Sequence, residues 1–110
     1  MLALEAGARI FLYKDPVSMR NGFEGLSAIV EIVFETKVIS GSYFAFINNR
    51  KDRMKVIYWD GDGPAIWYKR LEKGSFSGRE NTQDPMSRCE FFMLLEGVTA
   101  KREKLRYRLL

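Results

Sequence analysis

The sequence predicts an α+β fold, in which a small antiparallel sheet, a three-strand meander plus an N-terminal strand, packs with two helices in the order β-α-β-β-β-α. Three observations support this prediction. Apolar residues recur at helical spacing after Ser18, three aromatic-rich segments joined by short turns follow, and a helix-capping pattern precedes a last apolar run. The 110 residues are 46% hydrophobic, so we expect one domain over residues 1–100 and a basic tail over residues 101–110.

The N-terminal third predicts one strand and one helix. Residues 9–13 contain a short apolar run, typical of a buried strand, and Pro16 then prevents a continued ladder. Ser18 is a suitable helix N-cap. The apolar residues of the predicted helix recur at steps of three and four, namely Met19, Phe23, Leu26, Val30 and Val33. Gly22 and Gly25 each cost about 1 kcal/mol inside a helix, so either the first turns are irregular or another backbone packs closely there.

Three strands are predicted next, over residues 43–48, 54–59 and 65–71, because these segments are rich in aromatic and branched side chains. The short connections between them contain the Asn, Asp and Gly residues that tight turns require, which predicts an antiparallel meander. Both faces of this sheet carry large apolar groups. One small helix cannot cover all of them, so we expect a second layer or a partner on the other face.

A second helix is predicted near the end of the chain. Pro85 suits a first helical turn, and Ser87 with Glu90 has the spacing of a capping box. The apolar run of residues 91–95 provides the buried surface, and Gly97 is expected to end the helix.

The composition excludes much of the usual chemistry of enzymes. The chain has no histidine and one cysteine, Cys89, so it lacks the commonest general base and any cysteine-based zinc site. We expect no catalytic residues, no cofactor and no metal. The alternative is a catalytic metal site, formed if Asp60, Asp62 and Glu72 converge at one end of the sheet.

No apolar segment approaches the roughly 18 residues of a membrane span, and the N-terminus lacks the pattern of a signal peptide. The expected location is cytoplasmic.

Positive charge is the remaining functional signal. The net charge is +4, and the last ten residues hold five basic residues against one acidic residue, a pattern typical of tails that reach nucleic acid. A solvated rim that protects strand edges is the alternative for the other basic residues. The residues predicted to contact DNA are Arg50, Lys51, Arg53, Lys55, Lys69, Arg70, Lys73, Lys101, Arg102 and Arg106. Lys69 and Arg70 are adjacent in a strand, so they are expected on opposite faces.

The stretch from Phe46 to Gly63, followed by residues 67–74 with their Lys-Arg-Leu-Glu-Lys-Gly run, closely resembles the small accessory protein of insertion-sequence 66 family transposons. That protein is often called TnpB or the Orf-two-like protein. The similarity extends to residues 19–26 and to residues 94–97. The chain departs from the family pattern at Ser18, where the family tends to have aspartate, at residues 38–39, where it tends to have Asp-Pro, and at Ser75, where it tends to have arginine.

The resemblance implies a role in bacterial DNA transposition and recombination, beside a separate and larger transposase. We therefore expect a non-catalytic accessory protein that contacts transposon-end DNA through its basic hairpin residues. The alternative is an assembly adaptor that binds the transposase, other proteins of the element, or a second copy of itself, without specific DNA binding. The adaptor hypothesis rests on the large number of apolar side chains for so small a domain.

Overall fold

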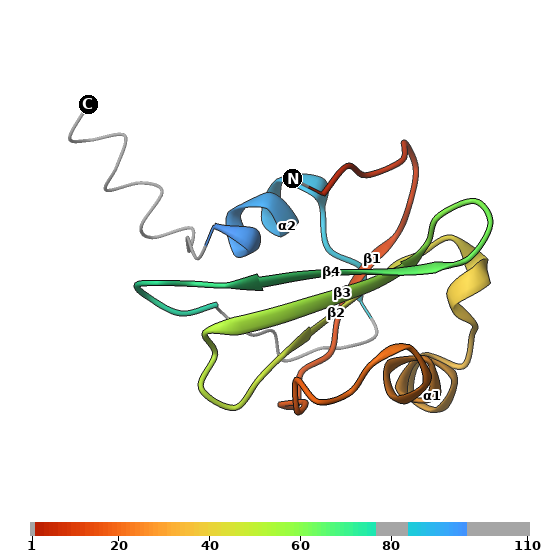
Figure 1. The fold of residues 1–110 in the computed structure, drawn as a ribbon. Coiled ribbons are helices and arrows are strands. Elements are labelled where there is room, and N and C mark those ends of the chain that lie inside the picture. Colours follow the sequence, from red (N-terminus) through yellow and green to blue (C-terminus); the bar gives the residue numbers. More distant parts are fainter. Residues whose placement is uncertain (1, 77–83, 97–110) are drawn as a thin grey trace.

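A four-stranded sheet with one helix on each face makes up the part of the chain that the computed structural model describes, residues 2–76 and 84–96 (Figure 1). The elements in chain order are β1 (Ile10–Leu12), α1 (Phe23–Phe34), the short 3₁₀ helix η1 (Val38–Ser40), β2 (Tyr43–Ile47), β3 (Arg53–Trp59), β4 (Pro64–Arg70) and α2 (Arg88–Leu95). The α+β class and the order of strands and helices are as predicted from the sequence. Figure 1 views the sheet nearly edge-on, with α2 above it and α1 below.

The strands lie in the spatial order β1-β2-β3-β4. Strands β2, β3 and β4 form the predicted antiparallel meander, with Val56 of β3 opposite both Ala45 and Trp67. Strand β1 runs parallel to β2, with Ile10 opposite Tyr43. The sheet is therefore mixed rather than wholly antiparallel. The physical reason is the crossover through α1, which returns the chain to the end of the sheet where β1 started.

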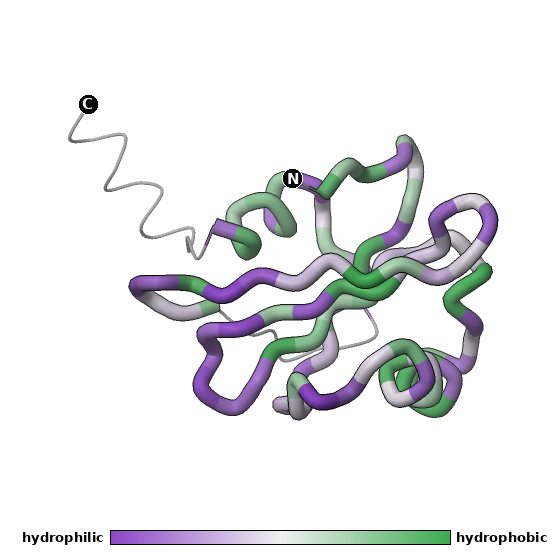
Figure 2. Tube along the Cα trace, viewed as in Figure 1, coloured by the Kyte–Doolittle hydropathy of each residue, from purple (hydrophilic) through white to green (hydrophobic). Residues whose placement is uncertain are grey.

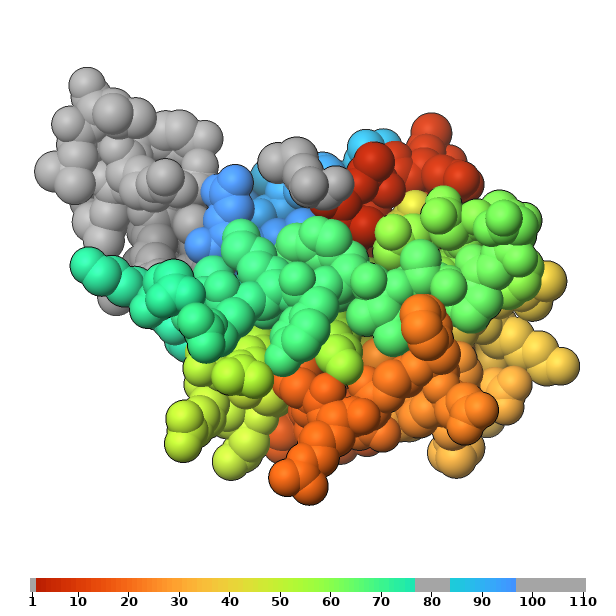
Figure 3. All heavy atoms as spheres, viewed as in Figure 1, coloured from red at the N-terminus to blue at the C-terminus, as the bar shows by residue number. Residues whose placement is uncertain are grey.

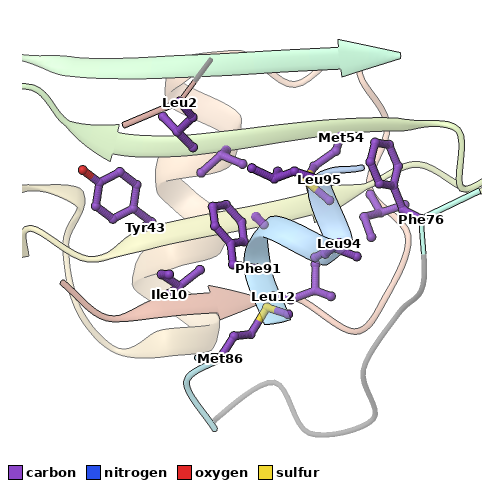
Figure 4. Packing of buried hydrophobic residues seen from close by; sticks show 13 residues of the cluster. Leu2, Ile10, Leu12, Tyr43, Met54, Phe76, Met86, Phe91, Leu94 and Leu95 are labelled. Carbon is purple, nitrogen blue, oxygen red and sulfur yellow. The ribbon is translucent and has the colours of Figure 1, made fainter. Parts of the chain in front are cut away.

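Strand β2 is buried at all five positions, because each of its faces packs against a different helix. Phe44 and Phe46 point to the α1 side, where they pack with Leu26 and Val30 of the helix. On the other side the buried cluster contains residues of the sheet, of α2 and of the loops (Figure 4): Leu2, Ile10, Leu12, Tyr43, Ala45, Ile47, Met54, Val56, Phe76, Met86, Phe91, Leu94 and Leu95. The two-layer cover expected from the apolar residues on both faces is thus supplied by the chain itself.

Helix α2 begins with the predicted capping box. The backbone N–H of Glu90 donates to Ser87 Oγ at 3.1 Å, and the N–H of Ser87 donates to Glu90 Oε1 at 3.3 Å. This reciprocal pair satisfies N–H groups that the first helical turn leaves without an intrahelical partner. Phe91, which follows directly, is fully buried against the sheet. Gly97, the predicted end of this helix, lies outside the described residues.

Helix α1 begins four residues later than a Ser18 N-cap would place it. Ser18 instead starts a turn, in which its Oγ accepts from the N–H of Arg20 at 3.2 Å and its carbonyl accepts from the N–H of Asn21 at 3.2 Å. Gly22 is the N-cap of α1, so the irregular first turns suggested by the glycines are found. Phe23 is consequently 49% exposed, and Leu26 and Val30 are the fully buried residues of the helix.

Candidate nucleic-acid interface

A cleft of about 700 Å³ lies between the loop that precedes α1 and the tip of the β2–β3 hairpin. Figure 3 shows the loop in orange beside the yellow-green hairpin, and Figure 2 shows that the hairpin tip is hydrophilic. Three arginines and one aspartate line the cleft, which leaves an excess of two positive charges. The full lining is Pro16, Val17, Ser18, Met19, Arg20, Asn48, Asn49, Arg50, Asp52, Arg53 and Tyr68.

The hairpin tip is held in shape by the side chain of Asn48. Its Oδ1 accepts from the backbone N–H groups of Asp52 at 3.1 Å and Arg53 at 3.0 Å, and its Nδ2 donates to Asp52 Oδ1 at 2.7 Å. An asparagine that bonds backbone groups a few residues ahead stabilises a turn. The hydrogen bond from Asn48 also holds the pKa of the Asp52 carboxyl below its usual value.

The same tip is bonded to the chain that follows β4. The N–H of Leu71 donates to the carbonyl of Asp52 at 2.8 Å, and the N–H of Phe76 donates to the carbonyl of Lys51 at 2.7 Å. Phe76 is fully buried, so its contact joins the tip to the core. Lys51 adopts a left-handed backbone, with φ of 62°, that closes the turn. Arg50 is therefore carried on a fixed backbone.

The loop on the opposite wall of the cleft is attached to the sheet at two points. The N–H of Val17 donates to the carbonyl of Ile47 at 2.9 Å, and the Val17 side chain is buried. Lys55 Nζ donates to the carbonyl oxygens of Met19 at 2.7 Å and Asn21 at 2.8 Å. Because Arg20 lies between these two carbonyls in sequence, the lysine positions the backbone that carries it.

The floor of the cleft is formed by side chains of β3 and β4. Arg53 and Arg70 are directly opposite in the strand register, an arrangement that like charges disfavour. Arg53 Nη1 donates to the Tyr68 hydroxyl at 3.3 Å, whereas Arg70 Nη2 pairs with Glu72 Oε1 at 3.0 Å. The two guanidinium groups thus bind different partners. The neighbouring Glu72 carboxylate raises the pKa of Arg70.

The structure brings some of the predicted DNA-binding residues together and separates others. Arg50 and Arg53 line the cleft, and Lys55 lies beside it with its ammonium group on backbone carbonyls. Arg70 is exposed and forms a salt bridge with Glu72. Lys51 lines a second, smaller hollow of about 240 Å³, beside residues 13–16 and 47–49.

Lys69 lies on the opposite face of the sheet from Arg70, as strand alternation predicts. Its Nζ donates to the carbonyl of Leu95 at 2.7 Å, so a cation from β4 neutralises the negative end of α2, whose last turn has no basic residue of its own. Lys73 is exposed beyond the end of β4. Lys101, Arg102 and Arg106 lie outside the residues that the structure describes.

Arg20 is the cleft arginine that the sequence reasoning missed. A helix from Ser18 onward would place Arg20 on its outer face, away from the hairpin. Because α1 begins at Phe23, Arg20 belongs to the loop and lines the cleft with Arg50 and Arg53. The available signal was the pair of glycines, which already indicated irregular first turns.

The acidic residues considered for a metal site do not meet. Asp60 and Asp62 lie in the β3–β4 turn, whereas Glu72 follows the other end of β4. Within residues 2–76 and 84–96, no three Asp, Glu or Cys side chains are grouped so that they could hold a metal ion.

Neither helix in this part of the chain has the length and apolar character needed to cross a bilayer.

Comparison with known proteins identifies a family whose region of similarity includes the cleft. The model of the IS66 Orf2 like protein matches residues 8–105. Two relatives come from Sinorhizobium fredii (strain NBRC 101917 / NGR234): the uncharacterized protein y4jC is 35% identical over 106 residues, 94% of this chain and 91% of the relative. The uncharacterized protein y4hO is 29% identical over 100 residues, 89% of this chain and 87% of the relative. No solved structure matches the chain.

The hydrogen bonds of Lys55 lead to a stability prediction. Lys55→Met keeps the aliphatic stem but leaves the carbonyls of Met19 and Asn21 without their donor, so the free energy of unfolding should fall by about 1–3 kcal/mol. Urea unfolding followed by tryptophan fluorescence measures this change. Lys73→Met, which removes an exposed lysine outside the cleft, is the matched control and should change stability by less than about 0.5 kcal/mol. Equal losses in both variants would show that the Lys55 bonds do not hold the loop.

Proposed function

The chain belongs to the IS66 Orf2-like protein family, and from this premise we propose that it is a non-catalytic accessory protein of DNA transposition that binds DNA in its arginine-lined cleft. Family membership associates the chain with IS66 transposition. The observation that supports DNA contact is the convergence of Arg20, from the loop before α1, with Arg50 and Arg53 of the β2–β3 hairpin on one cleft. We propose transposon-end DNA as the ligand and a separate, larger transposase as the catalytic partner.

Arginine chemistry supports a phosphate ligand. The guanidinium group is always charged and presents donors in a planar arrangement that matches phosphate oxygens. The backbones of Arg50 and Arg20 are fixed by the Asn48 turn and by the Lys55 hydrogen bonds. Less conformational entropy is therefore lost on binding than with arginines on a mobile loop.

Other basic residues are assigned a secondary role in this proposal. Lys51 and Lys73 are exposed near the hairpin tip and the end of β4, where they add to the positive field around the cleft. Lys101, Arg102 and Arg106 would add attraction to the phosphate backbone that is independent of sequence. We leave Lys69 out of the interface, because its ammonium group donates to the carbonyl of Leu95 at the end of α2.

The test is equilibrium binding of the Arg20→Ala, Arg50→Ala, Arg53→Ala triple variant to labelled transposon-end duplex across a salt series. Each lost phosphate contact lowers the slope of log affinity against log salt by roughly 0.9, so the triple variant should lose about 2 to 3 units of slope. Its affinity at low salt should fall accordingly.

The matched control removes three positive charges outside the cleft, in the variant Arg9→Ala, Lys37→Ala, Arg88→Ala. All three residues are exposed, and none of them lines the cleft. This control has the same net charge as the triple cleft variant, so a similar loss of slope in both would indicate general electrostatics and contradict a role for the cleft.

An assembly adaptor is the second candidate function. The observation that favours it is exposed apolar surface near the end of α1, where Ile32 is 78% and Ile39 of η1 is 61% exposed. Single exposed apolar residues are common on monomers, which is why this function ranks second.

If the adaptor function is correct, Ile32→Glu should abolish either self-association or retention of the transposase. Sedimentation at micromolar concentration measures the first, and a pull-down with purified transposase measures the second. Glu31→Gln, a change at the neighbouring exposed position, is the control. A wild-type protein that is monomeric and does not retain the transposase would remove the basis for this function.

A further inference from the structure

One aromatic side chain in the cleft is not needed by the core. Tyr68 of β4 is 48% exposed, although Phe44 and Phe46 on the same face of the sheet are fully buried. Its ring lies in the cleft lined by Arg20, Arg50 and Arg53, and both Arg53 and Lys55 contact it. An exposed ring surrounded by cations is the composition of sites that bind single-stranded nucleic acid.

The Tyr68 ring is held in a fixed orientation. Its hydroxyl accepts from Arg53 Nη1 at 3.3 Å, and Lys55 Nζ lies 5.0 Å from the ring centroid. Lys55 is itself fixed by hydrogen bonds to the carbonyls of Met19 and Asn21, so its ammonium group keeps its position against the ring. A ring oriented in advance loses little entropy when a flat ligand stacks on it.

We propose that the cleft binds an unpaired nucleotide, with its base stacked on Tyr68 and its neighbouring phosphates on Arg20 and Arg50. This inference rests on the proposed function and narrows its ligand to single-stranded or frayed DNA. In an intact duplex the bases are stacked on one another, and a shallow cleft meets mainly phosphates. The ring therefore has a partner only where the DNA is unpaired.

The stacking contact should favour single strands measurably. Base–aromatic stacking contributes about 1–3 kcal/mol per base, so loss of the ring should weaken single-strand binding by roughly tenfold or more. The contribution is tolerant of sequence, because every base has a flat face. The cleft should thus distinguish paired from unpaired DNA more strongly than it distinguishes one base from another.

The experiment compares two probes by fluorescence anisotropy, an oligothymidylate of about 12 nucleotides, within the range of small single-strand sites, and a blunt duplex of the same length. Tyr68→Leu should weaken binding of the oligothymidylate about tenfold or more and leave duplex binding within about twofold. Tyr68→Trp should retain single-strand affinity, because an indole also stacks. Phe23→Leu is the matched control, since Phe23 is as exposed as Tyr68 but lies outside the cleft.

The outcomes separate this inference from the proposed function. If Tyr68→Leu changes neither affinity, or weakens both equally, the inference is overturned, because the ring then only supports its neighbours Arg53 and Lys55. The proposed function still stands in that case if the triple arginine variant loses affinity. If the arginine variant also binds both probes like the wild type, the proposed function fails as well. Urea unfolding of Tyr68→Leu and Tyr68→Trp checks that both variants are folded.

Discussion

The cleft depends on one interaction, the pair of hydrogen bonds from Lys55 Nζ to the carbonyl oxygens of Met19 and Asn21. Lys55 belongs to β3, whose neighbour β2 is buried on both faces, so the lysine extends from a rigid part of the sheet. The loop it holds is otherwise bonded to the sheet through the backbone N–H groups of Tyr13 and Val17, which donate to the carbonyls of Ala45 and Ile47. The ammonium group of Lys55 also lies beside Tyr68. Lys55 therefore connects the loop and the exposed ring to the hairpin strand that carries it.

The basic residues divide into two groups by the atoms they contact. Lys55 and Lys69 place compact ammonium groups on backbone carbonyls, and thereby fix a loop and the end of a helix. The cleft arginines carry flat guanidinium groups, whose geometry matches the oxygens of a phosphate. A count of positive charge treats all these residues alike, whereas the contacts show that Lys55 supports a wall of the cleft that the arginines line and Lys69 supports the end of α2.

Much of the fold could be predicted from sequence, because turn and cap residues identify elements locally. The meander follows from its Asn, Asp and Gly turns, and α2 from the spacing of Ser87 and Glu90. The antiparallel direction expected for β1 was wrong, because strand composition alone gives no pairing direction, whereas the α1 crossover between β1 and β2 favours parallel strands. Arg20 was missed for a related reason: its position depends on where α1 begins, and Ser18 caps a turn as readily as a helix.

The central claim is that DNA is bound between the loop and the hairpin tip, and backbone amide chemical shifts recorded during a titration with transposon-end DNA test it most directly. Our account predicts the largest shift changes at residues 17–20, at residues 48–53 and at Tyr68, with little change over α1 and α2. Changes confined to the outer face of α1, with the cleft unaffected, would contradict the account and favour an adaptor role.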